Sequence, residues 1–177
     1  MNSDVDLFLE QFAAVNGTVH LRPPLEVVTE LLDARGVKSF LAWDEVADLT
    51  GELGRLGYVR VDIGDLADRT ADYLRVSDVA VGITGADAAL AESGSLVVRS
   101  GPGRMRLASL LPPVHVAILA RGRIFRSLTH WMTAHGDQVA GVANTVFITG
   151  PSRTGDIEQI MTLGVHGPGE VHVVLVD

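Results

Sequence analysis

Two segments of this 177-residue sequence combine residue types that suit the binding of an anion. Each consists of an apolar strand, a glycine-containing bend and the predicted start of a helix: residues 81–95 (VGITGADAALAESGS) and residues 146–159 (VFITGPSRTGDIEQ). N–H groups at a helix start attract carboxylate or phosphate, and glycine lets the main chain approach a ligand closely. The candidate ligand-binding residues of the two bends are Thr84, Gly85, Ala86, Gly150, Ser152, Arg153 and Thr154.

The second bend is the stronger candidate. Arg153 places a bidentate cationic group between two hydroxyl residues and two glycines, an arrangement with no evident role in packing. Glycine, serine and threonine are also ordinary residues of turns, and Thr84 with Asp87 matches a helix-capping pattern. Neither bend ends in the Gly-Lys-Ser/Thr of a phosphate-binding P-loop. Two interpretations therefore stay open: an anion site, and plain turn chemistry.

Four further residues are candidates for a role beside such a site. Glu92, in the stretch AESGS, is either a general acid, a base or a nucleophile, or a solvated residue in the last turn of a helix. Arg104 and Arg106 lie on a Gly/Pro-rich loop that either closes over an anion or stays solvated. His166, in the glycine-flanked segment GVHGPGE, is within reach of a ligand. The histidines lack the i, i+4 spacing of a helical metal site, so no metal site is predicted.

Apolar periodicity and turn residues predict alternating helices and strands around these segments. Helices are expected over residues 4–15, 24–36, 44–56 (with Asp44 as N-cap), 65–75, 127–135 and 156–163, and over a stretch that ends near Glu92. Strands are expected over residues 38–43, 58–63, 78–84, 95–99, 114–119, 123–125, 145–149 and 172–176, with those at 114–119 and 123–125 forming a hairpin. The pattern predicts an α/β fold with a mixed, largely parallel sheet flanked by helices. One domain is expected over residues 1–177, with N-terminal helices over about 4–35 and the core over about 38–177.

The composition of the chain disfavours several classes of function. The 14 Lys and Arg against 22 Asp and Glu give a net charge of −8, which disfavours general binding to nucleic acid. The chain has no cysteine, so by itself it forms no disulfide and holds no thiolate-ligated iron–sulfur cluster. The sequence contains no run of about 18 apolar residues, so no membrane span is predicted. Its acidic N-terminus is unlike a secretory signal. A cytoplasmic protein is therefore expected, and homo-oligomer formation is left open.

Three stretches resemble the LUD domain family, and within it the lactate utilization protein C group. They are ADAALAESGSLVV (residues 86–98), SLLPPVHVAIL (109–119) and ITGPSRTGDIEQIMTLGVHGPGEVHVVLVD (148–177). The resemblance is dense from about residue 76 to the C-terminus and thin over the first seventy residues. It implies the type of sheet found in coenzyme A transferases, ribose-5-phosphate isomerase and glucosamine-6-phosphate deaminase. It also implies a cytoplasmic role in oxidising L-lactate to pyruvate, together with iron–sulfur lactate utilization proteins.

The resemblance leaves the chemistry of this chain open. Larger relatives join the domain to cysteine-rich cluster-binding segments, which are absent here, so iron–sulfur clusters are expected only in partner proteins and no cofactor is expected on this chain. By fold-level analogy alone, AESGS is similar to the Glu-before-Gly turn that holds the coenzyme A transferase nucleophile, which would make Glu92 catalytic. The main hypothesis is a non-redox subunit of a lactate-oxidising system. The alternative is a stand-alone enzyme that acts on an acyl-CoA or a phosphorylated small molecule.

Overall fold

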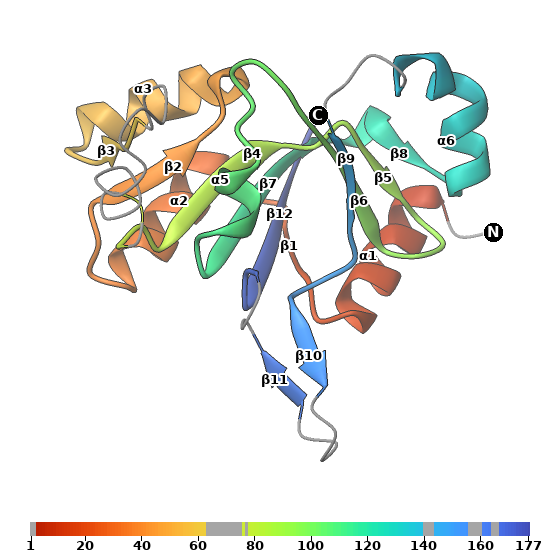
Figure 1. Ribbon diagram of the computed structural model, residues 1–177, viewed down its shortest axis with the longest axis horizontal. Coiled ribbons are helices and arrows are strands. Elements are labelled where there is room, and N and C mark those ends of the chain that lie inside the picture. Colours follow the sequence, from red (N-terminus) through yellow and green to blue (C-terminus); the bar gives the residue numbers. More distant parts are fainter. Residues whose placement is uncertain (1–2, 63–75, 77, 140–143, 156–160, 164–166) are drawn as a thin grey trace.

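A six-stranded sheet in which every pairing is parallel forms the centre of the protein (Figure 1). The computed structural model describes residues 3–62, 76, 78–139, 144–155, 161–163 and 167–177. In spatial order the strands are β1 (Thr18–His20), β12 (Glu170–Val176), β7 (Val114–Ala120), β4 (Val81–Gly85), β2 (Ser39–Ala42) and β3 (Val59–Arg60). The inner strands are mainly apolar and largely buried, as expected for a parallel sheet that is covered on both faces.

Helices α2 (Pro24–Asp33) and α3 (Ala47–Arg55) cover one face of this sheet. Pro24 suits the first turn of α2 because its fixed φ is already helical. A short 3-10 helix, η1 (Asp44–Val46), leads into α3. Successive residues of a strand point to opposite faces, so Val114 and Val116 pack against the α2–α3 side while Ala117 and Leu119 pack on the other side.

A second sheet and helix α1 (Asp4–Ala14) cover the opposite face. This sheet contains, in spatial order, β8 (Ile124–Phe125), β5 (Ala88–Leu90), β6 (Ser95–Ser100) and β9 (Asn144–Ile148). Strands β5 and β8 are parallel, whereas β6 runs antiparallel to both β5 and β9. Phe8 and Phe12 of α1 are fully buried in the core between the layers. These two sheets and the helices that flank them form a layered α/β structure.

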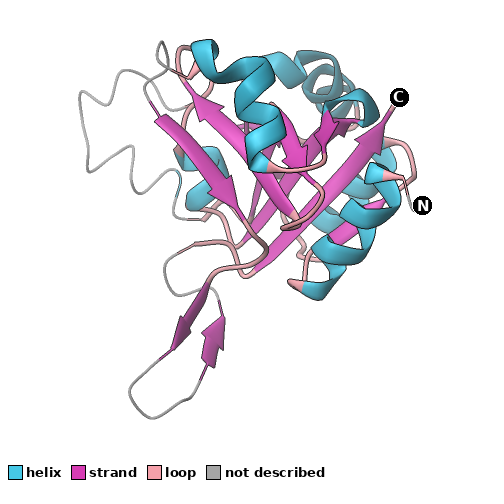
Figure 2. Ribbon diagram, turned by 90° about the vertical axis from the view of Figure 1, so that its right-hand side faces the viewer, coloured by secondary structure: helices cyan, strands magenta, loops and turns pink. Residues whose placement is uncertain are grey.

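Helix α5 (Leu107–Leu110) packs on the central sheet, with Ala108 buried in the core beside β4. The other elements are η2 (Arg121–Arg123), α6 (Leu128–His135), η3 (Gly136–Gln138), and the antiparallel pair β10 (Arg153–Gly155) and β11 (Met161–Leu163) (Figures 1 and 2). Figure 2 shows the β10–β11 pair extending away from the rest of the chain. Within the described residues, no helix combines the length and the apolar character needed to cross a bilayer.

The predicted α/β class and the largely parallel sheet are confirmed, and so are most of the predicted elements. Four local predictions are wrong. The stretch that ends near Glu92 contains β5 instead of a helix, and the segment predicted as a helix over 156–163 contains β11 at its described end. Strands β7 and β8 belong to different sheets and form no hairpin. Asp44 is no side-chain cap, since its carboxylate accepts a bond from Arg60. The helix expected over 65–75 lies outside the described residues.

Strand β1 was not predicted, although it completes the parallel sheet. It pairs with β12 through the register Thr18↔His172, Val19↔Val173 and His20↔Val174. Three residues are too few to show a strand period in a sequence, so no local signal marked this segment.

Gly82 marks the closest approach between the central sheet and helix α5. A Cβ at this position would overlap the main-chain carbonyl oxygen of Ala108. We therefore expect Gly82→Ala to lower the free energy of unfolding by about 2 kcal/mol, because backbone atoms have to shift. Gly51→Ala is the matched control: Gly51 lies in α3 with open space around it, so alanine there should stabilise the fold by about 1 kcal/mol. Urea unfolding of both variants measures the difference, and equal stability would contradict the expectation.

Candidate functional site

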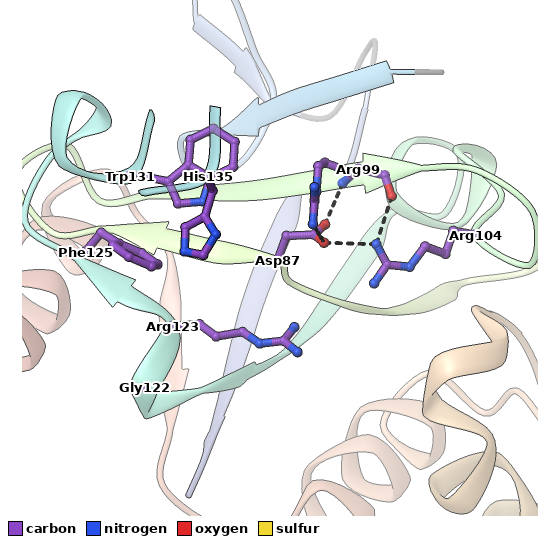
Figure 3. Close-up of a pocket in the computed structure, with 8 residues that line it drawn as sticks. All are labelled: Asp87, Arg99, Arg104, Gly122, Arg123, Phe125, Trp131 and His135. Carbon is purple, nitrogen blue, oxygen red and sulfur yellow. Dashed lines mark hydrogen bonds and ion pairs between the residues drawn. The ribbon is translucent and has the colours of Figure 1, made fainter. Parts of the chain in front are cut away.

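Two pockets lie at the carboxyl ends of the central parallel strands, the edge at which open α/β sheets bind ligands. The smaller pocket, of about 250 Å³, is lined by the ends of β4, β7 and β12 together with Glu45 and Arg123. The larger pocket, of about 330 Å³, is lined by residues that follow β4 and β7 and by residues of the second sheet and α6 (Figure 3). Arg123 lines both pockets. This edge is therefore the candidate site.

The turn after β4 carries the chain from the first sheet into the second and forms the boundary of the site. The Ala86 N–H donates to the carbonyl of Ile118 in β7 (2.9 Å), and the Asp87 N–H donates to the carbonyl of Val97 in β6 (2.9 Å). The Glu45 carboxylate lies directly against Gly85 at this turn, in the space that a Cβ would occupy. Asp87 is thereby held between the two sheets, at the wall of the larger pocket.

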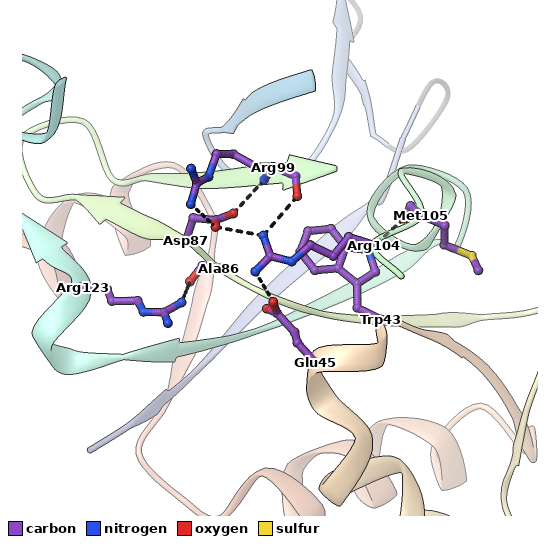
Figure 4. Close-up of polar contacts among 8 residues, drawn as sticks. All are labelled: Trp43, Glu45, Ala86, Asp87, Arg99, Arg104, Met105 and Arg123. Atoms are coloured by element: carbon purple, nitrogen blue, oxygen red, sulfur yellow. Dashed lines mark hydrogen bonds and ion pairs between the residues drawn. The ribbon is translucent and has the colours of Figure 1, made fainter. Parts of the chain in front are cut away.

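Asp87 is the electrostatic centre of the site. Its side chain is only 4% exposed and binds two guanidinium groups, Arg99 at 2.8 Å and Arg104 at 2.9 Å (Figure 4). The Arg99 main-chain N–H also donates to the Asp87 carboxylate (2.8 Å). Burial opposes ionisation of this carboxyl, but the bonds from Arg99 and Arg104 outweigh it and hold the pKa of Asp87 below its ordinary value. Asp87 is therefore ionised, and it fixes both arginines.

Arg104 fastens the loop after β6 to the rest of the site. Its guanidinium binds Glu45 as well as Asp87, and it lies over the ring of Trp43 at 5.0 Å from the ring centroid. The indole N–H of Trp43 in turn donates to the carbonyl of Met105 (2.8 Å), as Figure 4 shows. The loop is thus held at Arg104 and Met105, and these contacts keep the Arg104 guanidinium at the pocket wall.

Arg123 differs from these two arginines in its charge balance. Its guanidinium donates to the main-chain carbonyl of Ala86 (3.2 Å), and among the described residues no carboxylate forms an ion pair with it. The neighbouring Arg121, by contrast, points to the surface and pairs with Asp177 at 3.1 Å. A cation that lines two pockets without an acidic partner in the described chain is a ready binding group for a carboxylate or phosphate.

Aromatic side chains form the other wall of the larger pocket (Figure 3). Phe125 comes from β8, and Trp131 and His135 come from α6. The rings of Phe125 and His135 meet edge to face, with centroids 5.2 Å apart and planes at 85°. Trp131 is 2% exposed and packs edge to face against Phe147 of β9 (6.2 Å, 87°). The pocket therefore has a cationic wall and an aromatic wall.

The first of the two sequence-predicted bends lies at this site. Gly85 lines the smaller pocket, and Ala86 accepts the bond from Arg123. Thr84 is fully buried and bonds His115 (2.8 Å between Oγ1 and Nε2), so it caps no helix. Arg104 also lines the site, whereas Arg106 is exposed and lines neither pocket.

The second bend lies at the opposite end of the sheet, so the prediction that the two bends converge is wrong. Ser152 donates its N–H to the carbonyl of Pro168 (2.8 Å), two residues before β12 begins, whereas Gly85 pairs with Ile118 near the strand ends. Gly150 approaches the carbonyl of Val15, which also accepts a bond from Arg153 (3.0 Å). This bend leads into β10 instead of a helix, so it offers no helix N-terminus. Thr154 lies in β10, and His166 lies outside the described residues.

Glu92 lies apart from both pockets. It belongs to the turn between β5 and β6, is half exposed, and pairs with Arg126 at 3.1 Å. The groups that build the site, Asp87, Arg99 and Arg123, were not singled out from the sequence as ligand-binding residues. Arg123 was predicted only as the first residue of a strand over 123–125, and the stretch RGR, with two charges beside a glycine, was the one local signal available.

Comparison with known proteins identifies relatives of the whole chain. A family model described as the LUD domain matches residues 5–176. Lactate utilization protein C of Shouchella clausii is 35% identical over 155 residues, covering 84% of this chain and 66% of the relative. The protein of the same name from Halalkalibacterium halodurans is 29% identical and covers 86% and 68%, and that from an Exiguobacterium strain is 42% identical and covers 54% and 44%. The chain thus spans about two thirds or less of the length of these relatives.

One solved structure is similar over its full length. The crystal structure of a DUF162 family protein from Deinococcus radiodurans superposes with a TM-score of 0.67 and covers 100% of both chains. At 15% sequence identity, the likeness supports the fold alone.

Proposed function

This chain belongs to the LUD domain family, and on that premise we propose that it is a non-redox subunit of a lactate utilization system that binds a small carboxylate at Arg123. Lactate and pyruvate are a 2-hydroxy and a 2-oxo acid, and each presents one carboxylate to a protein. The relatives named lactate utilization protein C support the metabolic role. The position of Arg123 between two pockets, without an acidic partner in the described chain, is the observation that carries the binding site.

The division of labour follows from the chemistry of the oxidation. Converting lactate to pyruvate removes two electrons and two protons, and the electrons need an acceptor. Because this chain has no cysteine, thiolate-ligated iron–sulfur clusters belong to partner proteins in this proposal. In this proposal the chain binds the acid in the cytoplasm, and the partner proteins oxidise it. Its own residues bind and orient the carboxylate.

We expect Arg123→Gln to weaken the binding of L-lactate or pyruvate by about tenfold to a hundredfold, because a charge-assisted contact to the carboxylate is lost. Arg121→Gln is the matched control two residues away: Arg121 forms only an exposed pair with Asp177, so its loss should leave affinity unchanged. Isothermal titration calorimetry on the wild-type protein and both variants measures the change. If the wild-type protein and both variants bind the acid with the same affinity, Arg123 does not contact the carboxylate.

The same proteins test the metabolic role in cells. In a strain that lacks the gene and fails to grow on L-lactate, the Arg121→Gln gene should restore growth and the Arg123→Gln gene should not.

A thermal-shift panel that also contains an acyl-CoA and a sugar phosphate tests the alternative enzymatic hypothesis. A ligand at 100 times its dissociation constant raises the free energy of unfolding by about 2.7 kcal/mol, which such a panel detects. Stabilisation by either of these, with none by lactate or pyruvate, would contradict the proposal.

A further inference from the structure

The two walls of the larger pocket have different chemistry, and a three-carbon acid would engage only one of them. The cationic wall holds Arg104 and Arg123 beside Asp87, and the aromatic wall holds Phe125 and His135 (Figure 3). The volume of about 330 Å³ is at the lower end of the range for pockets that bind drug-sized molecules. Lactate bound at Arg123 would therefore leave the aromatic side of the pocket unused.

The aromatic wall is built to hold its geometry. Phe125 meets His130 as well as His135 edge to face, with centroids 5.9 Å and 5.2 Å apart. Trp131, which also lines the pocket, is buried. Aromatic rings attract one another edge to face or in offset stacks, because the positive ring edge meets the negative ring face. Phe125, Trp131 and His135 all line the pocket, so a planar ring that enters it meets aromatic side chains.

The charges of the opposite wall favour a ligand with a negative charge. Arg99 and Arg104 share the Asp87 carboxylate, and Arg104 also binds Glu45 at the margin of the site. Arg123 has no acidic partner among the described residues and is bonded to a neutral carbonyl. One anionic group can therefore be accepted beside Arg123 without displacing an internal ion pair.

We infer that the larger pocket binds a carboxylate attached to a planar aromatic ring, with the carboxylate at Arg123 and the ring against Phe125 and His135. The inference rests on the proposed function only in that Arg123 is the carboxylate-binding group. It extends that function by naming a second class of ligand, aromatic carboxylates, which competes with lactate or pyruvate for the same cation.

Two ligands of equal charge and similar size test the role of the ring directly. Benzoate and cyclohexanecarboxylate differ in that only benzoate is planar and aromatic. Isothermal titration calorimetry on the unaltered protein should show benzoate binding about three- to tenfold more tightly than cyclohexanecarboxylate. Benzoate should also raise the apparent dissociation constant of whichever 2-hydroxy or 2-oxo acid binds. Equal affinity for the two rings, or no binding of benzoate, would overturn the inference.

Phe125→Leu identifies the wall responsible, since it removes the ring and keeps an apolar side chain. The preference for benzoate should shrink to less than twofold. Phe147→Leu is the matched control: Phe147 is 44% exposed and lines neither pocket, so the preference should persist. A preference that survives Phe125→Leu would overturn the placement of the ring, and thermal unfolding verifies that each variant is folded.

The outcomes separate this inference from the proposed function. Binding of lactate or pyruvate without binding of benzoate would overturn the inference and leave the function standing. Binding of benzoate with none of lactate or pyruvate would contradict the small-acid function and support the inference. Loss of benzoate binding in Arg123→Gln, with retention in Arg121→Gln, is expected if the carboxylate lies at Arg123.

Discussion

Replacing Asp87 by asparagine is expected to lower the free energy of unfolding by about 3 kcal/mol. The side chain is 4% exposed and is shared by Arg99 and Arg104, so the substitution removes from the pocket wall the buried negative charge that both guanidinium groups contact. Removing one partner of a buried ion pair is costly because the remaining charge is desolvated and unpaired. The arginines are 17% and 27% exposed, which places the expected loss at the lower end of the usual range.

Urea unfolding at pH 7 measures this loss, with Asp177→Asn as the control. Asp177 also pairs with an arginine, but its side chain is fully exposed, so its neutralisation should change stability by less than about 0.5 kcal/mol. If the two variants are equally stable, Asp87 is not the organising charge of the site. Because Arg104 loses one of its two anchors, the pocket should also bind carboxylates differently in Asp87→Asn, which calorimetry can detect.

The protein is expected to lose stability as the pH falls from about 6.5 to about 4, with His115 as a principal cause. Burial, reinforced by the nearby His172, lowers the pKa of His115 to about 4. The unfolded chain binds this proton near pH 6.5 and the folded chain only near pH 4, so the stabilising contribution is complete above pH 6.5 and is lost on acidification. At about 1.4 kcal/mol per pH unit, the loss is about 3 kcal/mol.

The environment of His115 explains why the ring stays neutral. Its Nε2 lies 2.8 Å from Oγ1 of Thr84, while Nδ1 is buried with no hydrogen-bond partner among the described residues. A neutral ring with its proton on Nε2 donates to Thr84 and leaves Nδ1 as an acceptor, which costs less than a buried N–H without an acceptor. A second proton would create that unpaired donor inside the core.

His115→Gln separates this contribution from other titrations. Burial, followed by the charge of His172, lowers the pKa of His20, and burial lowers the pKa of His172, so both act in the same direction as His115. Glutamine does not titrate and retains an amide that can donate to Thr84. Unfolding free energies measured between pH 7 and pH 4 should therefore fall less steeply in the variant. A slope equal to that of the wild-type protein would show that His115 is not the group responsible.

The helix that was expected to end near Glu92 illustrates where local patterns failed. Ala88, Ala89 and Leu90 are good helix formers, and the sequence around them has a helix-like distribution of apolar residues. They form β5 because strands β6 and β8 pair with both of its edges, and all three residues are buried. Pairing and burial outweigh a helix propensity of a few tenths of a kcal/mol per residue. Strand β6 follows closely, but β8 begins only at Ile124, so no local window contains both partners of β5.

The two glycine bends show the same limit for the candidate site. Gly85 and Gly150 each follow an apolar strand, and in the sequence the second bend is the richer in binding groups. Strand β4 belongs to the parallel sheet, so its carboxyl end lies beside those of β7 and β12. Strand β9 belongs to the other sheet, antiparallel to β6, and its bend lies near the start of β12. Strand direction decided which bend meets the pockets.

The sequence by itself determined the class of fold, the acidic charge, the lack of thiolate ligands and the kinship to the LUD domain family, because composition and short-range periodicity carry that information. Only the tertiary structure decided which charged groups act together. Asp87, Arg99, Arg104 and Arg123 come from four different segments and meet where two sheets join. Whether a given arginine is neutralised or left without an acidic partner depends on distances between such segments, and residue spacing along the chain does not contain those distances.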